Sequence, residues 1–178
     1  MSRAYMPQAK SVEWSTPQGL FEQLNDEFNF TLDPCATPEN AKCAKFYTRE
    51  DDGLSKSWAG ERVFMNCPYG REASNWIAKA YFESQYAEVI VGLLPARTDV
   101  KWFHDFILTK AEIRFLKGRL KFVGSNGKAS SATFPSIVVI WRPPSRANST
   151  QGTCGDLNYD HCVSMPAQTG KVCKKEVN

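Results

Sequence analysis

The sequence predicts an α/β protein with an open, doubly wound sheet. Residues 88–95 form the clearest buried strand, because they are a continuous apolar run rich in β-branched residues, as in the central strands of parallel sheets. Residues 62–65 form a second strand, which passes directly into the polar turn Asn66-Cys67-Pro68-Tyr69. A helical pattern follows each strand. Open α/β sheets bind their ligands at the carboxyl ends of such strands, so this turn marks the expected site.

Length and composition are those of one globular domain. The chain has 178 residues, of which 42% are hydrophobic, and this is enough for a substantial core. Its net charge of +3 permits nucleic-acid binding without arguing for it. No apolar run approaches the roughly 20 residues of a membrane span, and the N-terminus lacks a signal-peptide core. We therefore expect a cytoplasmic protein.

The cysteines predict free thiols and no metal centre. The six cysteines form no Cys-x-x-Cys pair, and thiols stay reduced inside cells. Zinc ligation by Cys154, His161, Cys162 and Cys173 is the alternative, but their spacing fits no standard zinc finger. We therefore expect no metal ion.

The first predicted element is a helix that follows the Thr16-Pro17 pair, with Thr16 as its cap and Pro17 at its first position. Its apolar stripe at helical spacing consists of Leu20, Phe21, Leu24 and Phe28. The next predicted segments are a strand over residues 28–32 that ends in Asp33-Pro34, a short helix or turn with a brief strand over 39–47, and an acidic loop over 48–54.

Beyond the central turn, helices and strands alternate up to residue 141. The predicted elements are a helix over 72–87, the strand over 88–95, a helix capped by Thr98 that runs through Leu108, a strand over 111–116, a segment of alternating basic and apolar residues over 117–123, a loop over 124–133, and a last buried strand over 134–141. From residue 145 the composition becomes polar. We therefore expect a folded domain over residues 13–144 and a loosely ordered tail over 145–178.

The turn at residues 66–69 is expected to carry the chemistry. It resembles the Asn/Asp-Pro-Pro-Tyr motif of amino-methyltransferases, which methylate exocyclic amines of DNA bases with S-adenosylmethionine. The resemblance implies that the side-chain carbonyl of Asn66 and the backbone carbonyl of Cys67 accept the two amine protons and stabilise positive charge during transfer. Pro68 stiffens the turn, and Tyr69 offers a ring on which a flipped base stacks. Cys67 replaces the usual first proline but keeps the backbone carbonyl. An ordinary turn is the alternative interpretation.

The same resemblance implies a set of cofactor-binding residues. The Thr-Pro segment would close over the methionine part of the cofactor, and Asp33 would contact its ammonium group. The backbone at residues 35–36 would pass close to the ligand, while Glu50 or Asp51 would bind the ribose and Asp52 the adenine. The full set is Trp14, Thr16, Asp33, Cys35, Ala36, Glu50, Asp52 and Asn66. The family's glycine-rich loop is absent here, and a turn and a solvated acidic loop are the alternatives.

The order of the motifs extends the resemblance over residues 13–142. The series runs from the Thr-Pro helix through Asn-Cys-Pro-Tyr-Gly and Leu-Leu-Pro-Ala to Gly-Arg-Leu-Lys-Phe, and it is similar to the DNA N6-adenine methyltransferase (Dam-like) family of phages and prophages. It implies an abbreviated, Rossmann-like class I S-adenosylmethionine-dependent methyltransferase sheet. It also implies methyl transfer to the N6 amine of adenine in double-stranded DNA, in the cytoplasm of a bacterial host.

DNA contacts are expected from side chains beyond the strand ends, namely Arg97, Thr98, Arg119 and Lys121. Surface ion pairs, and an edge strand whose cations face water, are the alternatives. Two other functions also remain open. One is methylation of another amine, in cytosine, RNA or protein. The other is a DNA-binding or nucleotide-binding protein that keeps the fold without catalysis.

Overall fold

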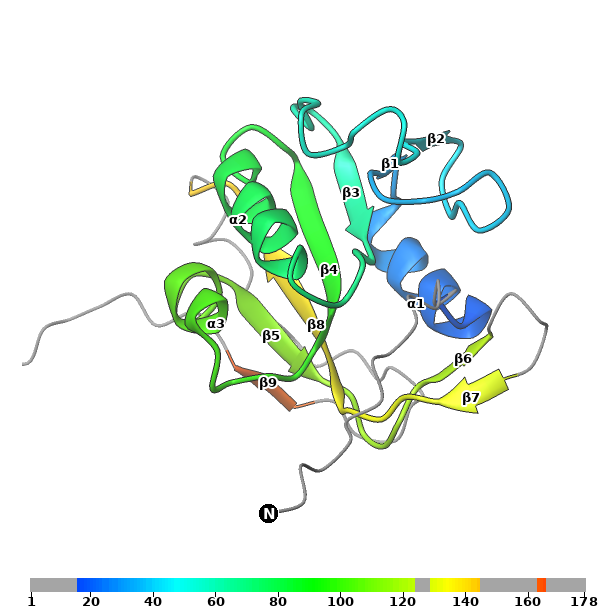
Figure 1. Cartoon of the computed structure of the whole chain (residues 1–178). Coiled ribbons are helices and arrows are strands. Elements are labelled where there is room, and N and C mark those ends of the chain that lie inside the picture. Colours follow the sequence, from blue (N-terminus) through cyan, green and yellow to red (C-terminus); the bar gives the residue numbers. More distant parts are fainter. Residues whose placement is uncertain (1–15, 124–128, 145–162, 166–178) are drawn as a thin grey trace, which may run out of the picture.

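The computed structural model of the protein describes residues 16–123, 129–144 and 163–165, and its centre is a seven-stranded sheet (Figure 1). In spatial order the strands are β2 (Lys45–Phe46), β1 (Leu32–Asp33), β3 (Arg62–Met65), β4 (Val89–Pro95), β8 (Ser136–Trp141), β5 (Glu112–Phe115) and β9 (Val163–Met165). The other elements are the hairpin of β6 (Lys121–Val123) and β7 (Ala129–Ser131), and the helices α1 (Gln18–Phe28), α2 (Ala73–Glu83) and α3 (Lys101–Phe106).

The sheet is parallel on one side and mixed on the other. Strands β2, β1, β3 and β4 are all parallel, so their carboxyl ends meet at one edge. Strand β8 then enters antiparallel between β4 and β5. Every residue of β4 is buried, as its apolar sequence predicts. The α/β prediction is confirmed, and the parallel strands flanked by helices form a Rossmann-like sheet.

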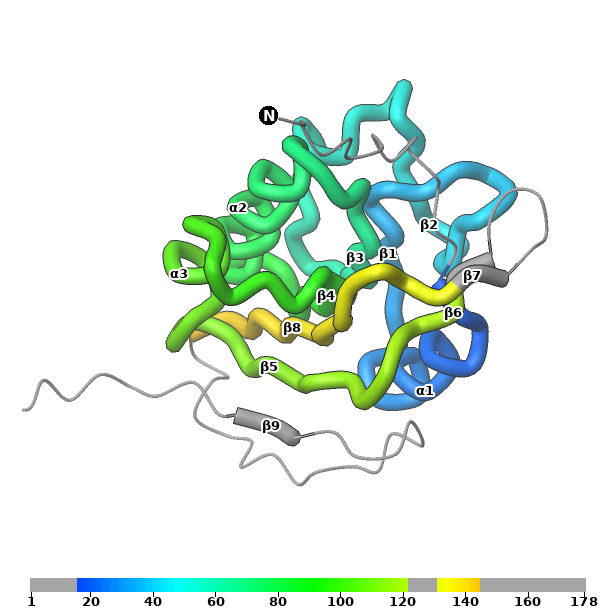
Figure 2. The backbone as a smooth tube through the Cα atoms, turned by 60° about the horizontal axis from the view of Figure 1, so that its bottom comes forward, coloured from blue at the N-terminus to red at the C-terminus, as the bar shows by residue number. Residues whose placement is uncertain are grey.

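Helices cover both faces of the sheet, as Figure 2 shows. Alternate residues of each strand point to opposite faces, so the core divides into two clusters. On one face α1 packs through Leu20, Phe21 and Leu24 against Phe64 of β3. The opposite face carries α2 and α3, which pack against a second cluster that contains Val63, Met65, Ile90, Leu94, Ile137 and Val139.

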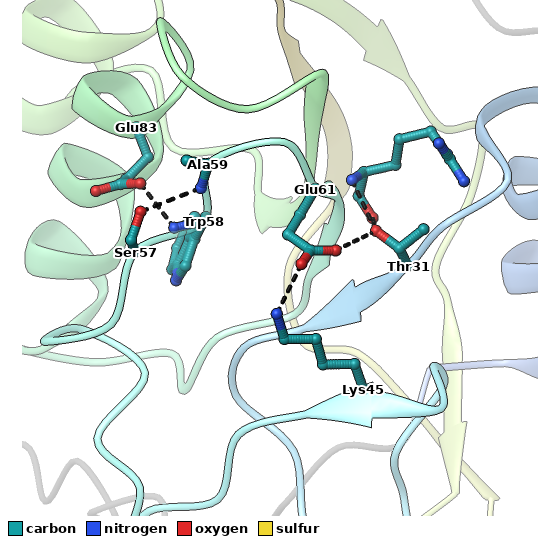
Figure 3. Close-up of polar contacts among 8 residues, drawn as sticks. Thr31, Lys45, Ser57, Trp58, Ala59, Glu61 and Glu83 are labelled. Atoms are coloured by element: carbon teal, nitrogen blue, oxygen red, sulfur yellow. Dashed lines mark hydrogen bonds and ion pairs between the residues drawn. The ribbon is translucent and has the colours of Figure 1, made fainter.

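Polar contacts at the amino ends of the strands fix the chain that leads into β3 (Figure 3). Glu61 accepts a hydrogen bond from Thr31 Oγ1 at 2.6 Å and pairs with Lys45 Nζ at 2.7 Å. The Glu83 carboxylate, at the end of α2, accepts the backbone N–H of Trp58 at 2.8 Å. These contacts join β1, β2 and α2 to β3, and so fix where β3 reaches the opposite edge.

Two predicted details at the start of the chain are wrong. Thr16 does not cap α1, because the N-cap position is occupied by Pro17 and no side chain bonds there. The strand expected over residues 28–32 is much shorter, since α1 continues to Phe28 and ends at Asn29, which has a left-handed backbone (φ 50°). Only Leu32 and Asp33 are left to form β1. Trp14 lies outside the described residues.

The second half of the chain also differs in its boundaries. Thr98 does not cap α3, whose N-cap is Val100 in an extended conformation. The basic segment does not continue β5, because the chain turns at Gly118 (φ 82°) before it enters the hairpin. Part of the predicted loop over 124–133 is strand β7.

Strand β9 lies within the predicted tail and pairs antiparallel with β5 at the sheet edge. The rest of residues 145–178 lies outside the described residues, so the division into domain and tail stays a prediction. Within the described ranges, no helix is long and apolar enough to cross a membrane.

Candidate active site

The predicted turn follows β3 at the carboxyl edge, where its neighbour β4 also ends. The side-chain amide of Asn66 is hydrogen-bonded through both its nitrogen and its oxygen. Its Nδ2 donates to Thr16 Oγ1 at 3.0 Å, and its Oδ1 accepts from the Tyr69 hydroxyl at 2.9 Å. That hydroxyl also lies 3.0 Å from the backbone carbonyl of Leu93 in β4. The turn is therefore tied both to the start of α1 and to the neighbouring strand.

Tyr69 is turned inward in this arrangement. Its ring packs edge-on against Phe134, with a centroid separation of 5.4 Å and an interplanar angle of 78°. Burial raises the pKa of the Tyr69 phenol well above its ordinary value, so the hydroxyl stays protonated and donates. The structure thus gives the hydroxyl a bonding role, whereas the sequence suggested a role for the ring alone. Stacking of a base on this ring stays a prediction.

Two cysteine thiols lie close to the turn without being reactive. Cys67 is buried in the α2–α3 side of the core, and burial raises the pKa of its thiol to about 12. Burial also raises the pKa of Cys35, whose sulfur accepts the backbone N–H of Asn66. Thiols kept neutral in this way are poor nucleophiles. Their chemistry fits a structural role, which leaves the backbone carbonyl of Cys67 as the functional group expected there.

Asp33 is a buried carboxylate at the end of β1, and its side chain accepts the backbone N–H groups of Lys42 at 3.2 Å and Cys35 at 3.5 Å. Burial raises the pKa of Asp33 to about 6, and these hydrogen bonds and the Lys42 charge oppose the shift. An ionised carboxylate at this position is stabilised by a cationic ligand, because a nearby positive charge favours the charged form. The buried Ala36 donates its own backbone N–H to the Tyr47 carbonyl at 3.0 Å.

The acidic loop after β2 packs directly onto the Asp33-Pro34 corner. A Cβ atom on the buried Gly53 would lie 2.1 Å from the Pro34 carbonyl oxygen, so only glycine permits this approach. Asp51 is used inside the loop, where its carboxylate accepts both the N–H and the hydroxyl of Thr48 at 2.9 Å. The carboxylates of Glu50 and Asp52 are exposed. Both acids therefore lie at the surface of the loop, and their contact with the cofactor stays a prediction.

Exposed cations lie beyond the same edge of the sheet. Arg97 and Thr98 are exposed just after β4, and the Thr98 carbonyl bonds the His104 ring at 2.8 Å. Arg119 and Lys121 are exposed on the segment that leaves the carboxyl end of β5 for the hairpin. Figure 1 shows this hairpin beside the start of α1. Leu120 anchors it, because its side chain packs into the α1 side of the core.

A buried carboxylate, an adjacent acidic loop and a polar amide lie at one edge of the sheet. Their oxygen atoms could accept hydrogen bonds from a methyl-donating cofactor that carries ammonium and hydroxyl groups. Sequence reasoning missed three contributors, namely the Leu93 carbonyl, the Lys42 amide and Gly53. Only Gly53 has a local signal, the Asp-Gly turn pair.

In the part of the chain that the structure describes, no group of three or more His, Cys, Asp and Glu side chains could hold a metal ion. The cysteines beyond residue 145 lie outside it.

A Rossmann-like sheet with Asn-Cys-Pro-Tyr after one strand and a buried aspartate after its neighbour defines an amino-methyltransferase. The family model described as DNA N-6-adenine-methyltransferase (Dam) matches residues 3–158, and the chain belongs to this family. It is 31% identical over 186 residues to the DNA N-6-adenine-methyltransferase of Escherichia phage T1, covering 94% of this chain and 78% of the relative. It is 27% identical over 151 residues to that of Haemophilus phage HP1, covering 82% and 87%.

Proposed function

We propose that this methyltransferase takes its methyl group from S-adenosylmethionine and transfers it to the N6 amine of adenines in double-stranded DNA, with Asn66 and the Cys67 carbonyl as the proton acceptors. One observation carries the residue assignment. Asn66 Oδ1, at the carboxyl edge, already accepts a hydrogen bond from a neutral donor, the Tyr69 hydroxyl at 2.9 Å. An amine placed there would meet the same acceptor.

The chemistry explains why two acceptors are needed. The lone pair of the adenine N6 amine is conjugated with the ring and is a poor nucleophile. When Asn66 Oδ1 and the Cys67 carbonyl hold its two protons, they favour a tetrahedral nitrogen and stabilise the positive charge that develops on it. The incoming amine would replace the Tyr69 hydroxyl as the donor to Oδ1. The hydroxyl keeps a second acceptor in the Leu93 carbonyl, at 3.0 Å, so this exchange leaves it bonded.

The cofactor residues follow from charge and position. S-adenosylmethionine supplies an electrophilic methyl group and carries an ammonium group. Asp33, buried and with its pKa raised to about 6, is the anion that this ammonium would stabilise. Glu50 and Asp52 are exposed on the loop that Gly53 packs against Pro34, and we assign them to the hydroxyl and amine groups of the nucleoside.

DNA binding is assigned to the exposed residues Arg97, Thr98, Arg119 and Lys121. They come after β4 and after β5, on the edge that carries the turn, so DNA bound there would bring its bases to Asn66. Lysine and arginine contacts to phosphate supply most of the affinity of such complexes. A base inside a duplex cannot reach a half-buried amide, and the target adenine must therefore leave the stack.

Transfer of tritium from labelled S-adenosylmethionine to duplex DNA, followed by nucleoside analysis, tests this proposal. We expect the label in N6-methyladenine and a loss of roughly a hundredfold or more in Asn66→Ala, the size seen when one group that stabilises transition-state charge is removed. The matched control is Gln85→Ala, which truncates an exposed amide after α2, at the opposite edge of the sheet. Label in another base, or full activity of Asn66→Ala, would contradict the assignment.

A further inference from the structure

The hydroxyl of Thr16 has no role in its own helix. Threonine before proline at the start of a helix ordinarily caps it. Here Pro17 holds the N-cap position, and among the described residues no side chain makes a capping hydrogen bond there. Thr16 is nevertheless 5% exposed, so its hydroxyl is held inside the protein. A buried hydroxyl needs a partner, and this one is bonded by the side chain of Asn66 at 3.0 Å.

The partner is the nitrogen edge of the catalytic amide, 50 residues along the chain. An asparagine amide has an oxygen side that accepts hydrogen bonds and a nitrogen side that donates them, and the two sides have nearly the same shape. Neighbouring groups must therefore determine which way the amide is oriented. A substrate amine offers protons, and it therefore requires Oδ1 on its side. Nδ2 must then find an acceptor on the opposite side. The Thr16 hydroxyl lies there.

The helix that follows Thr16 is packed firmly against the sheet. Residues Leu20 and Leu24 of α1 are fully buried against the sheet, in the cluster that includes Phe64 of β3. Helix α1 and strand β3 therefore share one packed core. A hydroxyl held by this packing keeps the amide plane in place while a base enters, which is the precision that a reacting group requires.

We propose that Thr16 is a positioning residue for methyl transfer, which acts by accepting Nδ2–H of Asn66 and so keeps Oδ1 directed at the substrate amine. This inference rests on the proposed function of Asn66. It assigns Thr16 to the catalytic amide rather than to the cofactor, where the sequence placed it. Without the hydroxyl, the amide loses the acceptor that Thr16 gives to Nδ2 when Oδ1 faces the substrate, and the reactive orientation becomes less populated.

Two substitutions separate these roles. Thr16→Val keeps the shape and removes the acceptor, while Thr16→Ser keeps the hydroxyl. We expect the single-turnover rate of Thr16→Val, at saturating S-adenosylmethionine and DNA, to fall about tenfold or more, the factor that one buried hydrogen bond represents. Affinity for S-adenosylhomocysteine, measured by calorimetry, should stay within about twofold, because an orienting contact affects the rate more than cofactor binding. Thr16→Ser should recover most of the rate.

Three results would overturn the inference. These are an unchanged rate in Thr16→Val, an equal loss in Thr16→Ser, and a loss of S-adenosylhomocysteine affinity with a normal rate at saturation, which would make Thr16 a cofactor ligand. The side-chain amide protons of Asn66, observed by nuclear magnetic resonance, give a readout that needs no activity. Their exchange with solvent should quicken about tenfold in Thr16→Val, as expected for the loss of one hydrogen bond. If wild-type protein showed this protection but methylated no DNA, the proposed function would fail and the contact would stand.

Discussion

Replacing Asp33 by asparagine should make the protein more stable and a poorer cofactor binder at the same time. Among the described residues, the buried carboxylate accepts hydrogen bonds from the backbone N–H groups of Lys42 and Cys35. Burial disfavours its charge, so its ionisation at neutral pH weakens the fold when no cation is bound. The amide of asparagine fills the same space without that charge.

The size and sign of the effect follow from the pKa of Asp33, which burial raises from an ordinary 3.8 to about 6. Because the folded protein holds the proton more tightly, the contribution of Asp33 to wild-type stability is full below about pH 4 and is lost as the pH rises through about 6. A shift of roughly two pKa units corresponds to about 3 kcal/mol, and a weakened backbone hydrogen bond offsets about 1 kcal/mol of this. Asp33→Asn should therefore gain about 2 kcal/mol at pH 8 and lose about 1 kcal/mol at pH 4, where the wild-type side chain is also uncharged.

Urea denaturation of the two proteins at pH 4 and pH 8 measures this difference, and calorimetry with S-adenosylhomocysteine measures the opposite effect on binding. Loss of a charge-assisted hydrogen bond to the ammonium should weaken binding by about 10- to 100-fold at pH 8. The affinity of wild-type protein for S-adenosylhomocysteine should also fall below pH 6, where Asp33 is protonated. The affinity of the variant should not change over this pH range. If Asp33→Asn were equally destabilised at both pH values, burial would not be disfavouring the charge, and the reasoning would be refuted.

Tyr69→Phe should keep kcat/KM for DNA within severalfold of wild type, because the ring is retained, whereas Tyr69→Ala should lose about 10- to 100-fold, the usual worth of a base-stacking contact. Equal losses in both would move the function to the hydroxyl. Arg119→Ala and Lys121→Ala should each reduce the salt dependence of DNA binding by about one in the log–log slope, with S-adenosylhomocysteine affinity unchanged. An unaltered slope would remove the hairpin segment from the DNA interface.

Local signals predicted much of the fold. The buried strands β3, β4 and β8 and the apolar faces of α1 and α2 follow from periodicity, which a short window of sequence contains. The direction of β8 could not be predicted in this way. A continuous apolar run such as Ile137 to Ile140 shows the same pattern in a parallel and in an antiparallel strand. The helix starts were wrong for a related reason. The hydroxyl of Thr16 bonds Asn66 instead of its own helix, and no local pattern reports so distant a partner.

The candidate site divides in the same way. Residues 66–69 are contiguous and form a recognisable motif, so the turn could be predicted. The arrangement around it could not. The Tyr69 hydroxyl meets the Leu93 carbonyl 24 residues away, and Gly53 meets Pro34 through backbone atoms that every residue type shares. Such contacts depend on strand order, which emerges only when the sheet is assembled.

The antiparallel placement of β8 has a consequence for how the protein is made. Strand β8 pairs with both β4 and β5, yet it is synthesised after both of them. Until residue 141 leaves the ribosome, β4 and β5 have no common partner, and the surface that receives α1 lacks Val138 and Ile140. Long-range strand pairing of this kind is slow and comes late in folding. We therefore expect the surface under α1 to be completed only after β8 has emerged.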